Sequence, residues 1–175
     1  MDGDFFMYYY LNTFLIYSIL GYLLETVVAF VTRSHFESGI LFGPWTPIYG
    51  VGTVIIILLS NYLFMNLHLP RFYETVIIFF LLTIFLTAIE WLGGITIEAL
   101  FHQVFWDYSD QAWSIGHYIS LSMSLVWGLG SILFIYVIKP LLEPLVVRIP
   151  PVLTLLFFVL FLCDIGFTTY QKIAK

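Results

Sequence analysis

The order of apolar and polar residues divides the chain into five long apolar segments separated by short breaks. The segments lie at about 5–31, 47–66, 73–101, 117–139 and 150–171. A helix needs about 20 apolar residues to cross the hydrocarbon core of a bilayer. Unpaired backbone groups cannot face lipid, so these segments are expected to be helices. The pattern predicts an all-α integral membrane protein, a bundle of five transmembrane helices in a single domain over residues 1–175.

The breaks between the apolar segments are rich in proline, glycine and aromatic residues. They read "GPWTP" at 43–47, "HLPR" at 68–71, "FWDYSD" at 105–110, and "KPLLEP" with "RIPP" within 139–151. With five spans, the loops at 32–46 and 102–116 share one side of the membrane with the C-terminus, and we call this side the loop face. We expect these two loops to contact each other and to act as a gate, because Pro44 and Pro47 stiffen the first of them.

The composition excludes an ordinary soluble domain. Hydrophobic residues make up 61% of the chain and charged residues only 10%, with a mean hydropathy of +1.00. Folded soluble proteins carry about 25% charged residues. The net charge of −5 is spread thinly along the chain, so the sequence offers no basic patch for nucleic acid. The bilayer is therefore the first expected partner.

The distribution of basic residues leaves the membrane orientation open. The loop face has Arg33, Lys172 and Lys175, and the opposite face has Arg71, Lys139 and Arg148. Three residues against three is a tie under the positive-inside rule. Asp2 and Asp4 precede the first span and Arg33 follows it, which favours a cytoplasmic loop face.

A weak internal repeat relates spans 1–2 to spans 3–4. The stretches "LGYLLETVVAF…GPWTPIYG" and "LTAIEWLGGIT…FWDYSD…IGHY" each place a glutamate late in a helix, before a loop with an aromatic turn. Such a repeat would relate the two pairs by an axis along the membrane normal, as in some transporters. Chance similarity between two apolar hairpins explains the pattern at least as well.

Four acids lie inside the predicted spans, and Glu90 is the most difficult to explain as a structural residue. They are Glu25, Glu90, Glu98 and Asp164. An ionised carboxylate within the hydrocarbon costs at least about 2.5–3.5 kcal/mol. Glu90 follows fifteen uncharged residues and has no cation within one turn. Intramembrane ionisable groups are candidates for function by default, so Glu90 is the leading functional residue.

The other three acids have structural alternatives. Glu25 can pair with Arg33, Glu98 can be a solvated acid at the membrane interface, and Asp164 can accept a hydrogen bond from Thr168 or Thr169. Glu98 and His102 are also spaced as metal ligands, but no HExxH motif or cysteine cluster supports such a site. The sequence therefore predicts no metal site and identifies no cofactor.

Polar residues of the fourth segment recur at helical spacing. They are His117, Ser120, Ser124 and Trp127, at spacings of 3, 4 and 3. One stripe of this kind faces the interior of a helix bundle. We expect a polar cavity that opens on the loop face and is lined by Glu25, Glu90 and His117. Asn12, Thr13, Ser60 and Asn61 are the polar residues available for an exit in the other half of the membrane.

Four short stretches resemble one known family. "GYLLE", "GPWTPIYGVG", "WDYS" and "LVWGLG" are similar, in order and spacing, to the bacterial membrane family labelled putative ABC-transporter type IV, or CmpB-like permeases. "WDYS" is also similar to an element of vertebrate transmembrane proteins of unknown role. The resemblance covers about residues 15–140 and implies transport in a bacterial cell membrane. An ABC permease needs an ATPase subunit and a coupling helix, and neither is visible in the chain.

The family pattern overlaps the residues reached from chemistry. It matches Glu25, Gly43, Pro44, Pro47, Tyr49, Gly50, Glu90, Trp106, Asp107 and Tyr108. Family members often carry arginine where this chain has Ser38 and His117, so a ligand held by those arginines is not expected here. The candidate ligand-binding residues are Glu25, Tyr49, Glu90, Trp106, Asp107, Tyr108, His117 and Ser120, and the candidate catalytic residues are Glu90 and His117.

Three functions are consistent with these residues. The first is a small permease or solute-binding membrane subunit with an acidic intramembrane cavity, in which Glu90 and Glu25 bind a cation, an amine or a proton. Its small number of spans suggests a homodimer or a partner subunit. The second is an intramembrane enzyme for a lipid or lipid-linked substrate, with Glu90 as general base and His117 as acid or base. The third is a non-catalytic membrane scaffold.

Overall fold

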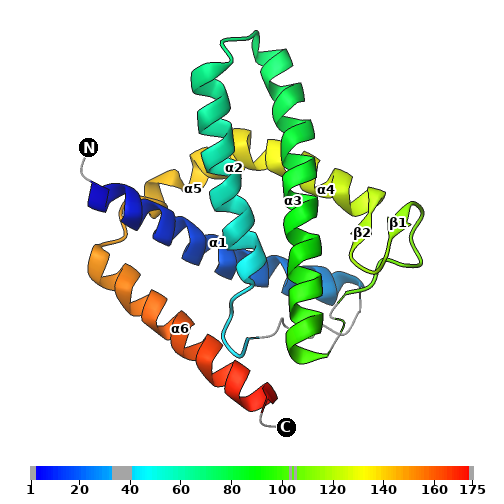
Figure 1. Ribbon diagram of the computed structural model, residues 1–175. Helices are drawn as coiled ribbons and strands as arrows, with labels where there is room; N and C mark the ends of the chain where they lie inside the picture. Colours follow the sequence, from blue (N-terminus) through cyan, green and yellow to red (C-terminus); the bar gives the residue numbers. More distant parts are fainter. Residues whose placement is uncertain (1–2, 33–40, 103, 105, 174–175) are drawn as a thin grey trace. The chain divides into compact units, whose positions relative to one another are not determined.

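The computed structural model describes residues 3–32, 41–102, 104 and 106–173, and most of them are helical (Figure 1). Five helical segments are long and apolar enough to cross a membrane: Phe5–Val31, Pro47–Asn66, Arg71–Phe101, Leu121–Val146 and Pro151–Lys172. The prediction of an all-α protein with five spans is confirmed. The chain is a multi-pass membrane protein, and the bilayer is its environment.

The elements follow one another as helices with a single small hairpin between the third and fourth spans. They are α1 (Gly3–Thr32), α2 (Pro47–Asn66), α3 (Arg71–Phe101), β1 (Ser114–Ile115), β2 (Ile119–Ser120), α4 (Leu121–Leu133), the π-helical η1 (Phe134–Ile138), α5 (Lys139–Val146) and α6 (Pro151–Ile173). By their contacts they form two compact units. The first unit contains the chain up to Val54 and from Glu143 onward, and the second contains Ile55–Leu142.

The fourth span begins later than the sequence pattern predicts. We expected it from residue 117, but α4 begins at Leu121. The Ser120 side chain accepts a hydrogen bond from the backbone N–H of Met123, 3.2 Å away, and caps the helix. A serine in this position satisfies one of the N–H groups that have no partner within the helix. His117 therefore lies outside the helix, and the stripe predicted from His117 to Trp127 begins only at Ser120.

The fourth span also ends later than expected, because the "KPLLEP" stretch is helical. The helix continues from α4 through η1 into α5, and it ends at Val146. In the π-helical turn the backbone N–H of Lys139 bonds the carbonyl of Phe134, five residues earlier. Pro140 is the second residue of α5, and because proline lacks a backbone N–H it cannot continue the regular bonding pattern of the helix; it lies just after the π-helical turn, where that pattern already changes. The break between the fourth and fifth spans is thus confined to residues 147–150.

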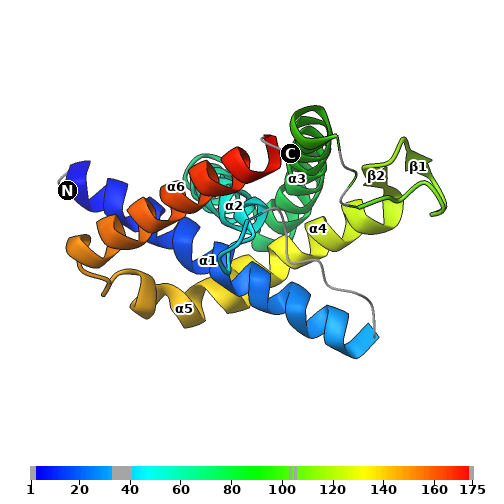
Figure 2. The same cartoon turned by 90° about the horizontal axis from the view of Figure 1, so that it is seen from below.

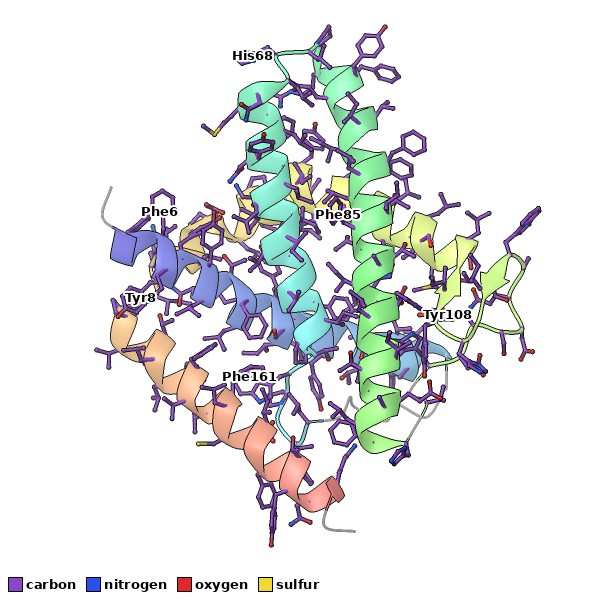
Figure 3. The ribbon with its side chains drawn as sticks, viewed as in Figure 1. Phe6, Tyr8, His68, Phe85, Tyr108 and Phe161 are labelled. Carbon is purple, nitrogen blue, oxygen red and sulfur yellow. The ribbon has the colours of Figure 1, made fainter. Side chains whose placement is uncertain are left out.

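In the first unit α1 and α6 run side by side (Figure 2). Leu15, Trp45 and Phe161 form a buried apolar cluster, and Figure 3 labels Phe161 on α6. Asn12, only 3% exposed, donates a hydrogen bond to the carbonyl of Val146 at 3.1 Å. Thr154 in turn donates to the Asn12 side chain. Asn12 therefore joins α1 to the start of α6, where the sequence suggested a polar exit.

In the second unit α3 packs against α4, which crosses it (Figure 1). The buried residues of α3 recur at every fourth position: Glu74, Ile78, Leu82, Leu86, Glu90 and Gly94. Glu74 and Glu143 are two further acids within the observed spans, in addition to the four named from the sequence. On α4, a Cβ atom added to Gly128 would collide with Thr83 and with the ring of Phe79. Glycine at this position permits the close approach of the two helices.

Candidate functional site

Residues 106–120 form a compact hairpin in the second unit, between α3 and α4 (Figure 1). Its strands are antiparallel, with Ser114 opposite Ser120 and Ile115 opposite Ile119. Gly116 in the connecting turn has a φ of +62°, a conformation that glycine adopts without strain. This hairpin carries five of the eight candidate ligand-binding residues.

Glu90 is buried where the hairpin meets α3. Its side chain is 4% exposed, and Oε1 accepts a hydrogen bond from the Tyr108 hydroxyl at 2.9 Å; Figure 3 labels Tyr108 beside α3. The indole of Trp127 on α4 interacts with the same carboxylate. Oε2 makes no hydrogen bond of good geometry to any residue that the structure describes. Buried polar atoms are nearly always satisfied, so this oxygen can accept a proton or a ligand.

A second tyrosine of the hairpin bonds a second carboxylate of α3. The Tyr118 hydroxyl donates to Glu98 Oε2 at 2.9 Å, and Tyr118 is itself 4% exposed. Its ring lies against Gly94, where an added Cβ would come within 2.5 Å. Trp106 packs edge-on against Tyr118, with 5.6 Å between ring centroids. Two tyrosine–carboxylate bonds therefore hold the hairpin on α3, with Gly94 between the acids Glu90 and Glu98.

The side chains of Asp107 and His117 make an exposed polar contact across the hairpin. The atoms His117 Nδ1 and Asp107 Oδ1 are 3.1 Å apart, and the backbone N–H of Tyr108 donates to the His117 carbonyl at 2.7 Å. Asp107 Oδ1 also accepts the Ser109 backbone N–H at 2.8 Å. These interactions lower the pKa of Asp107 to about 2, and the hydrogen bond from the Ser109 backbone N–H contributes most. The ionised form of Asp107 thus stabilises the hairpin turn.

Acidification should loosen this hairpin only at low pH. The pKa of Asp107 is about 2 in the fold and about 3.9 in an unfolded chain. Its contribution to stability is complete above about pH 4 and is lost as the pH falls through the folded pKa. Hydrogen exchange at the Tyr108 amide measures this opening, and Asp107→Asn should remove its acid dependence. Loss of protection already at pH 6 would mean that another group controls the hairpin.

Ser120 has a structural partner that the sequence did not reveal. It is 0% exposed, and its hydroxyl donates to Gln111 Oε1 at 2.8 Å. Ser122 donates to the same oxygen at 2.5 Å. Gln111 lies in a polar stretch without a recognisable motif, so no sequence signal identified it. These contacts give Ser120 a role in joining the hairpin to α4.

In the first unit, Glu25 and Tyr49 form a pair that resembles the one between Glu98 and Tyr118. The Tyr49 side chain interacts with the Glu25 carboxylate. The Tyr49 ring lies against Gly21, four residues before Glu25, and an added Cβ there would approach Tyr49 Cβ to 2.6 Å. The alternative pairing of Glu25 with Arg33 lies outside the described residues, as does Ser38.

Asp164 anchors the "FGPW" part of the first loop. Its carboxylate accepts the backbone N–H groups of Phe42 at 3.2 Å and Gly43 at 2.9 Å. The Thr168 hydroxyl donates to Asp164 Oδ1 at 3.2 Å, which confirms one of the two predicted threonine partners. Asp164 is thus a structural residue of α6 that holds the loop beside the buried Trp45.

Asp164→Asn is expected to lower the thermal stability of the purified protein. The amide oxygen of asparagine can accept one of the two loop N–H groups, but the other loses a charged acceptor. A hydrogen bond to a charged group contributes about 1.5 kcal/mol or more, so we expect a loss of about 1 kcal/mol after partial replacement. Thermal unfolding in detergent measures it. An unchanged midpoint would show that these two bonds add no stability.

The candidate residues divide between the two units. Glu25 and Tyr49 belong to the first unit, and the other six belong to the second. A cavity shared by Glu25, Glu90 and His117 stays a prediction, as does contact between the two loops. Among the described residues, no group of three or more His, Cys, Asp or Glu side chains is arranged to hold a metal ion.

In a comparison with known proteins, the chain matches one protein family. The chain matches the family described as "Putative ABC-transporter type IV" over residues 12–169, which confirms the resemblance of the four short stretches and extends it to all five spans. Neither a search of curated proteins nor a search of solved structures found a match. The matched region covers most of the chain, including the hairpin and the glutamates on α1 and α3. The chain therefore belongs to the putative ABC-transporter type IV family, and this description together with its five apolar helices fits a membrane transport protein.

Proposed function

We propose that this protein is a small membrane permease in which the Glu90 carboxylate binds a proton or a small cation during transport. The proposal rests on the hydrogen bonding of this carboxylate, which is buried within a membrane span. One oxygen is bonded to Tyr108, and the other is buried without a hydrogen bond of good geometry to the described residues. Family membership supports transport as the process that uses it.

A carboxylate in this environment favours a neutralising partner. An ionised carboxylate accepts hydrogen bonds but donates none, and burying its charge is costly when the neutral donors around it do not satisfy both oxygens. A proton on Oε2 or a bound cation removes that penalty. Tyr108 remains a donor to Oε1 in both cases, because Oε1 keeps lone pairs when Oε2 is protonated. Glu90 can thus exchange a proton or cation without losing its bond to the hairpin.

The hairpin is the proposed gate. Tyr108 both bonds Glu90 and, through its backbone N–H, bonds the His117 carbonyl that closes the hairpin. Movement of the hairpin away from α3 would therefore change the environment of the carboxylate. We propose that Glu25, with Tyr49, is a further ligand-binding residue in the first unit, and that five spans act with a second copy or a partner subunit.

Flux measurements in proteoliposomes test the proposal. Purified protein is reconstituted with a trapped pH-sensitive dye, and gradients of Na⁺, K⁺, ammonium or methylammonium are applied. Wild-type protein should couple one of these gradients to proton movement, and Glu90→Gln should lose this flux. Glu143→Gln is the matched control, since Glu143 also accepts a tyrosine hydroxyl, that of Tyr9 at 3.1 Å. Equal flux in wild type and Glu90→Gln, or none from the whole panel, would refute the proposal.

The geometry gives less support to an intramembrane enzyme. In that alternative Glu90 and His117 act together as base and acid. The His117 side chain contacts Asp107 and the ring of Tyr118, and it is 54% exposed. Glu90 instead has Tyr108, whose hydroxyl is an ordinary hydrogen-bond donor. The arrangement therefore favours binding at Glu90 over acid–base catalysis by the pair.

A further inference from the structure

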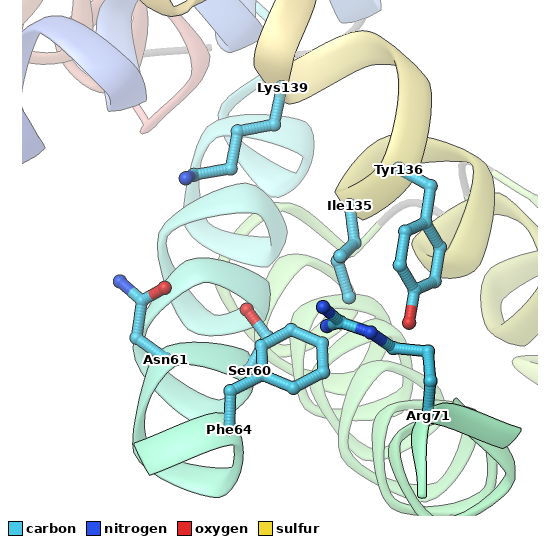
Figure 4. Close-up of a pocket in the computed structure, with 7 residues that line it drawn as sticks. All are labelled: Ser60, Asn61, Phe64, Arg71, Ile135, Tyr136 and Lys139. Carbon is cyan, nitrogen blue, oxygen red and sulfur yellow. The ribbon is translucent and has the colours of Figure 1, made fainter. Parts of the chain in front are cut away.

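A second polar site lies in the second unit, away from the hairpin. It is a pocket of about 460 Å³ between α2, α3 and the η1–α5 segment (Figure 4). Its lining residues are Ser60, Asn61, Phe64, Arg71, Ile135, Tyr136 and Lys139. Two of them are cations, and no aspartate or glutamate is among the described residues that line it. The charge of the lining therefore favours an anion.

The two cations reach the pocket from different elements. Arg71 is the first residue of α3 and Lys139 the first of α5, and Figure 4 shows their side chains extending into the opening from opposite sides. The Arg71 guanidinium lies 5.2 Å from the centroid of the Phe64 ring. Stacking of this kind restrains the guanidinium plane, while its N–H groups remain directed outward for a planar or tetrahedral anion.

Hydrogen bonds fix the shape of the pocket between α3 and η1. The Thr75 hydroxyl donates to the Arg71 carbonyl at 2.8 Å, and the hydroxyls of Thr75 and Tyr136 are 2.7 Å apart. Because the Thr75 hydroxyl already donates its proton to the Arg71 carbonyl, the Tyr136 hydroxyl is the donor in the bond between Tyr136 and Thr75. Tyr136 thus holds the π-helical turn against the first turn of α3 and keeps a lone pair. Arg71 and Lys139 are the charged residues that line the site.

The π-helical turn beside this pocket supports the interpretation that the pocket is a functional site. Such turns are rare and occur frequently at functional sites. Here η1 contributes Ile135 and Tyr136 to the lining and directly precedes Lys139. Glu74, the acid in the first turn of α3, is 7% exposed and is not among the lining residues. The opening therefore presents positive charge within an otherwise apolar set of helices.

We infer that this pocket binds a phosphate-bearing anion. Arginine binds phosphate oxygens with two parallel N–H groups, and lysine adds a point charge. The pocket lies near the ends of α2 and α3, where the exposed apolar side chains of Met65 and Phe72 offer a surface for acyl chains. A phospholipid head group and a water-soluble phosphate ester share the chemistry that the pocket recognises. The inference does not depend on the role of Glu90.

Native mass spectrometry of the full-length protein in neutral detergent tests this site. The probes are phosphatidylglycerol, the zwitterionic phosphatidylcholine, and glycerol phosphate. The variants are Arg71→Gln and Lys139→Gln, and the matched control is Arg148→Gln, an exposed basic residue outside the pocket. Each pocket variant should weaken binding of the preferred probe by about tenfold or more, because each removes a charged donor. Binding by Arg148→Gln should equal that of wild type.

The outcomes separate the two sources of the anion. Preference for phosphatidylglycerol over glycerol phosphate supports a lipid head group, and the reverse preference supports a soluble ester. Equal binding by wild type and both pocket variants, or no retention of any probe, overturns the inference. Thermal unfolding without ligand identifies a variant that fails to fold. In that case the binding measured for the other pocket variant tests the inference. Arg71→Lys adds a further check, since it keeps the charge but loses the paired donors and should bind at an intermediate level.

Discussion

Replacing Glu90 by glutamine is expected to abolish proton-coupled flux while leaving the fold intact. Glutamine keeps an oxygen that can accept the Tyr108 hydroxyl, at the place where Oε1 lies 2.9 Å from it. It removes the negative charge and the exchangeable proton on which the proposed transport depends. Hydrogen bonds between transmembrane helices contribute about 0.6 kcal/mol on average, so the thermal midpoint should move little. Thermal unfolding in detergent beside the flux assay measures both effects.

The leucine variant separates charge from hydrogen bonding. Glu90→Leu removes the acceptor of Tyr108 as well as the charge, so the hairpin should exchange its amides faster than in wild type or in Glu90→Gln. Glu143→Gln should leave flux unchanged, which shows that loss of a tyrosine-bonded carboxylate elsewhere in the chain is not sufficient. A Glu90→Gln protein with full activity would reduce Glu90 to a residue of helix packing and favour the scaffold alternative.

The spans were predictable because the bilayer constrains them so strongly. An apolar run of sufficient length has almost no alternative to a membrane helix. The ends of the fourth span were predicted less well, because its limits depend on local bonding. Ser120 caps α4 through its own side chain, and the π-helical turn before Pro140 carries the helix through a stretch that reads as a break.

The partners of the candidate residues could not be read from spacing along the chain. Tyr108 lies 18 residues after Glu90, and Tyr118 lies 20 residues after Glu98. Their bonds require the hairpin to fold back on α3, and its short strands leave no clear alternation of apolar and polar residues. The chemistry of Glu90 was nevertheless visible, because an acid after a long apolar run is expensive to bury. The sequence thus identified the Glu90 carboxylate as a candidate but did not reveal its hydrogen bond with the Tyr108 hydroxyl.

The contacts suggest a different alignment of the predicted repeat. The sequence placed Glu25 opposite Glu90, since both follow an apolar run. In the structure Glu25 follows Gly21 by four residues and interacts with Tyr49, whose ring covers Gly21. Glu98 follows Gly94 by four residues and bonds Tyr118, whose ring covers Gly94. Glu90 then has no counterpart in the first unit, and this is a reason to test it before Glu25.

Gly94→Ala is expected to release the hairpin from α3. A Cβ at this position would come within 2.5 Å of the Tyr118 ring, which is itself buried and packed against Trp106. The ring cannot remain there, so its bond to Glu98 is strained or lost. Overpacking of this kind costs about 1–3 kcal/mol. We expect a lower thermal midpoint and faster hydrogen exchange at the Tyr108 amide.

Gly130→Ala is the matched control, because in the described part of the chain nothing beyond the neighbouring residues and the helix's own backbone lies within 4 Å of the Cβ that it would add. In a helix, alanine in place of glycine stabilises by about 0.5–1 kcal/mol, so the two variants should move the thermal midpoint in opposite directions. If the hairpin is the gate, Gly94→Ala should also alter the flux that depends on Glu90, whereas Gly130→Ala should not. A Gly94→Ala protein with slow exchange at Tyr108 and normal flux would show that the packing of Tyr118 does not control access to the carboxylate.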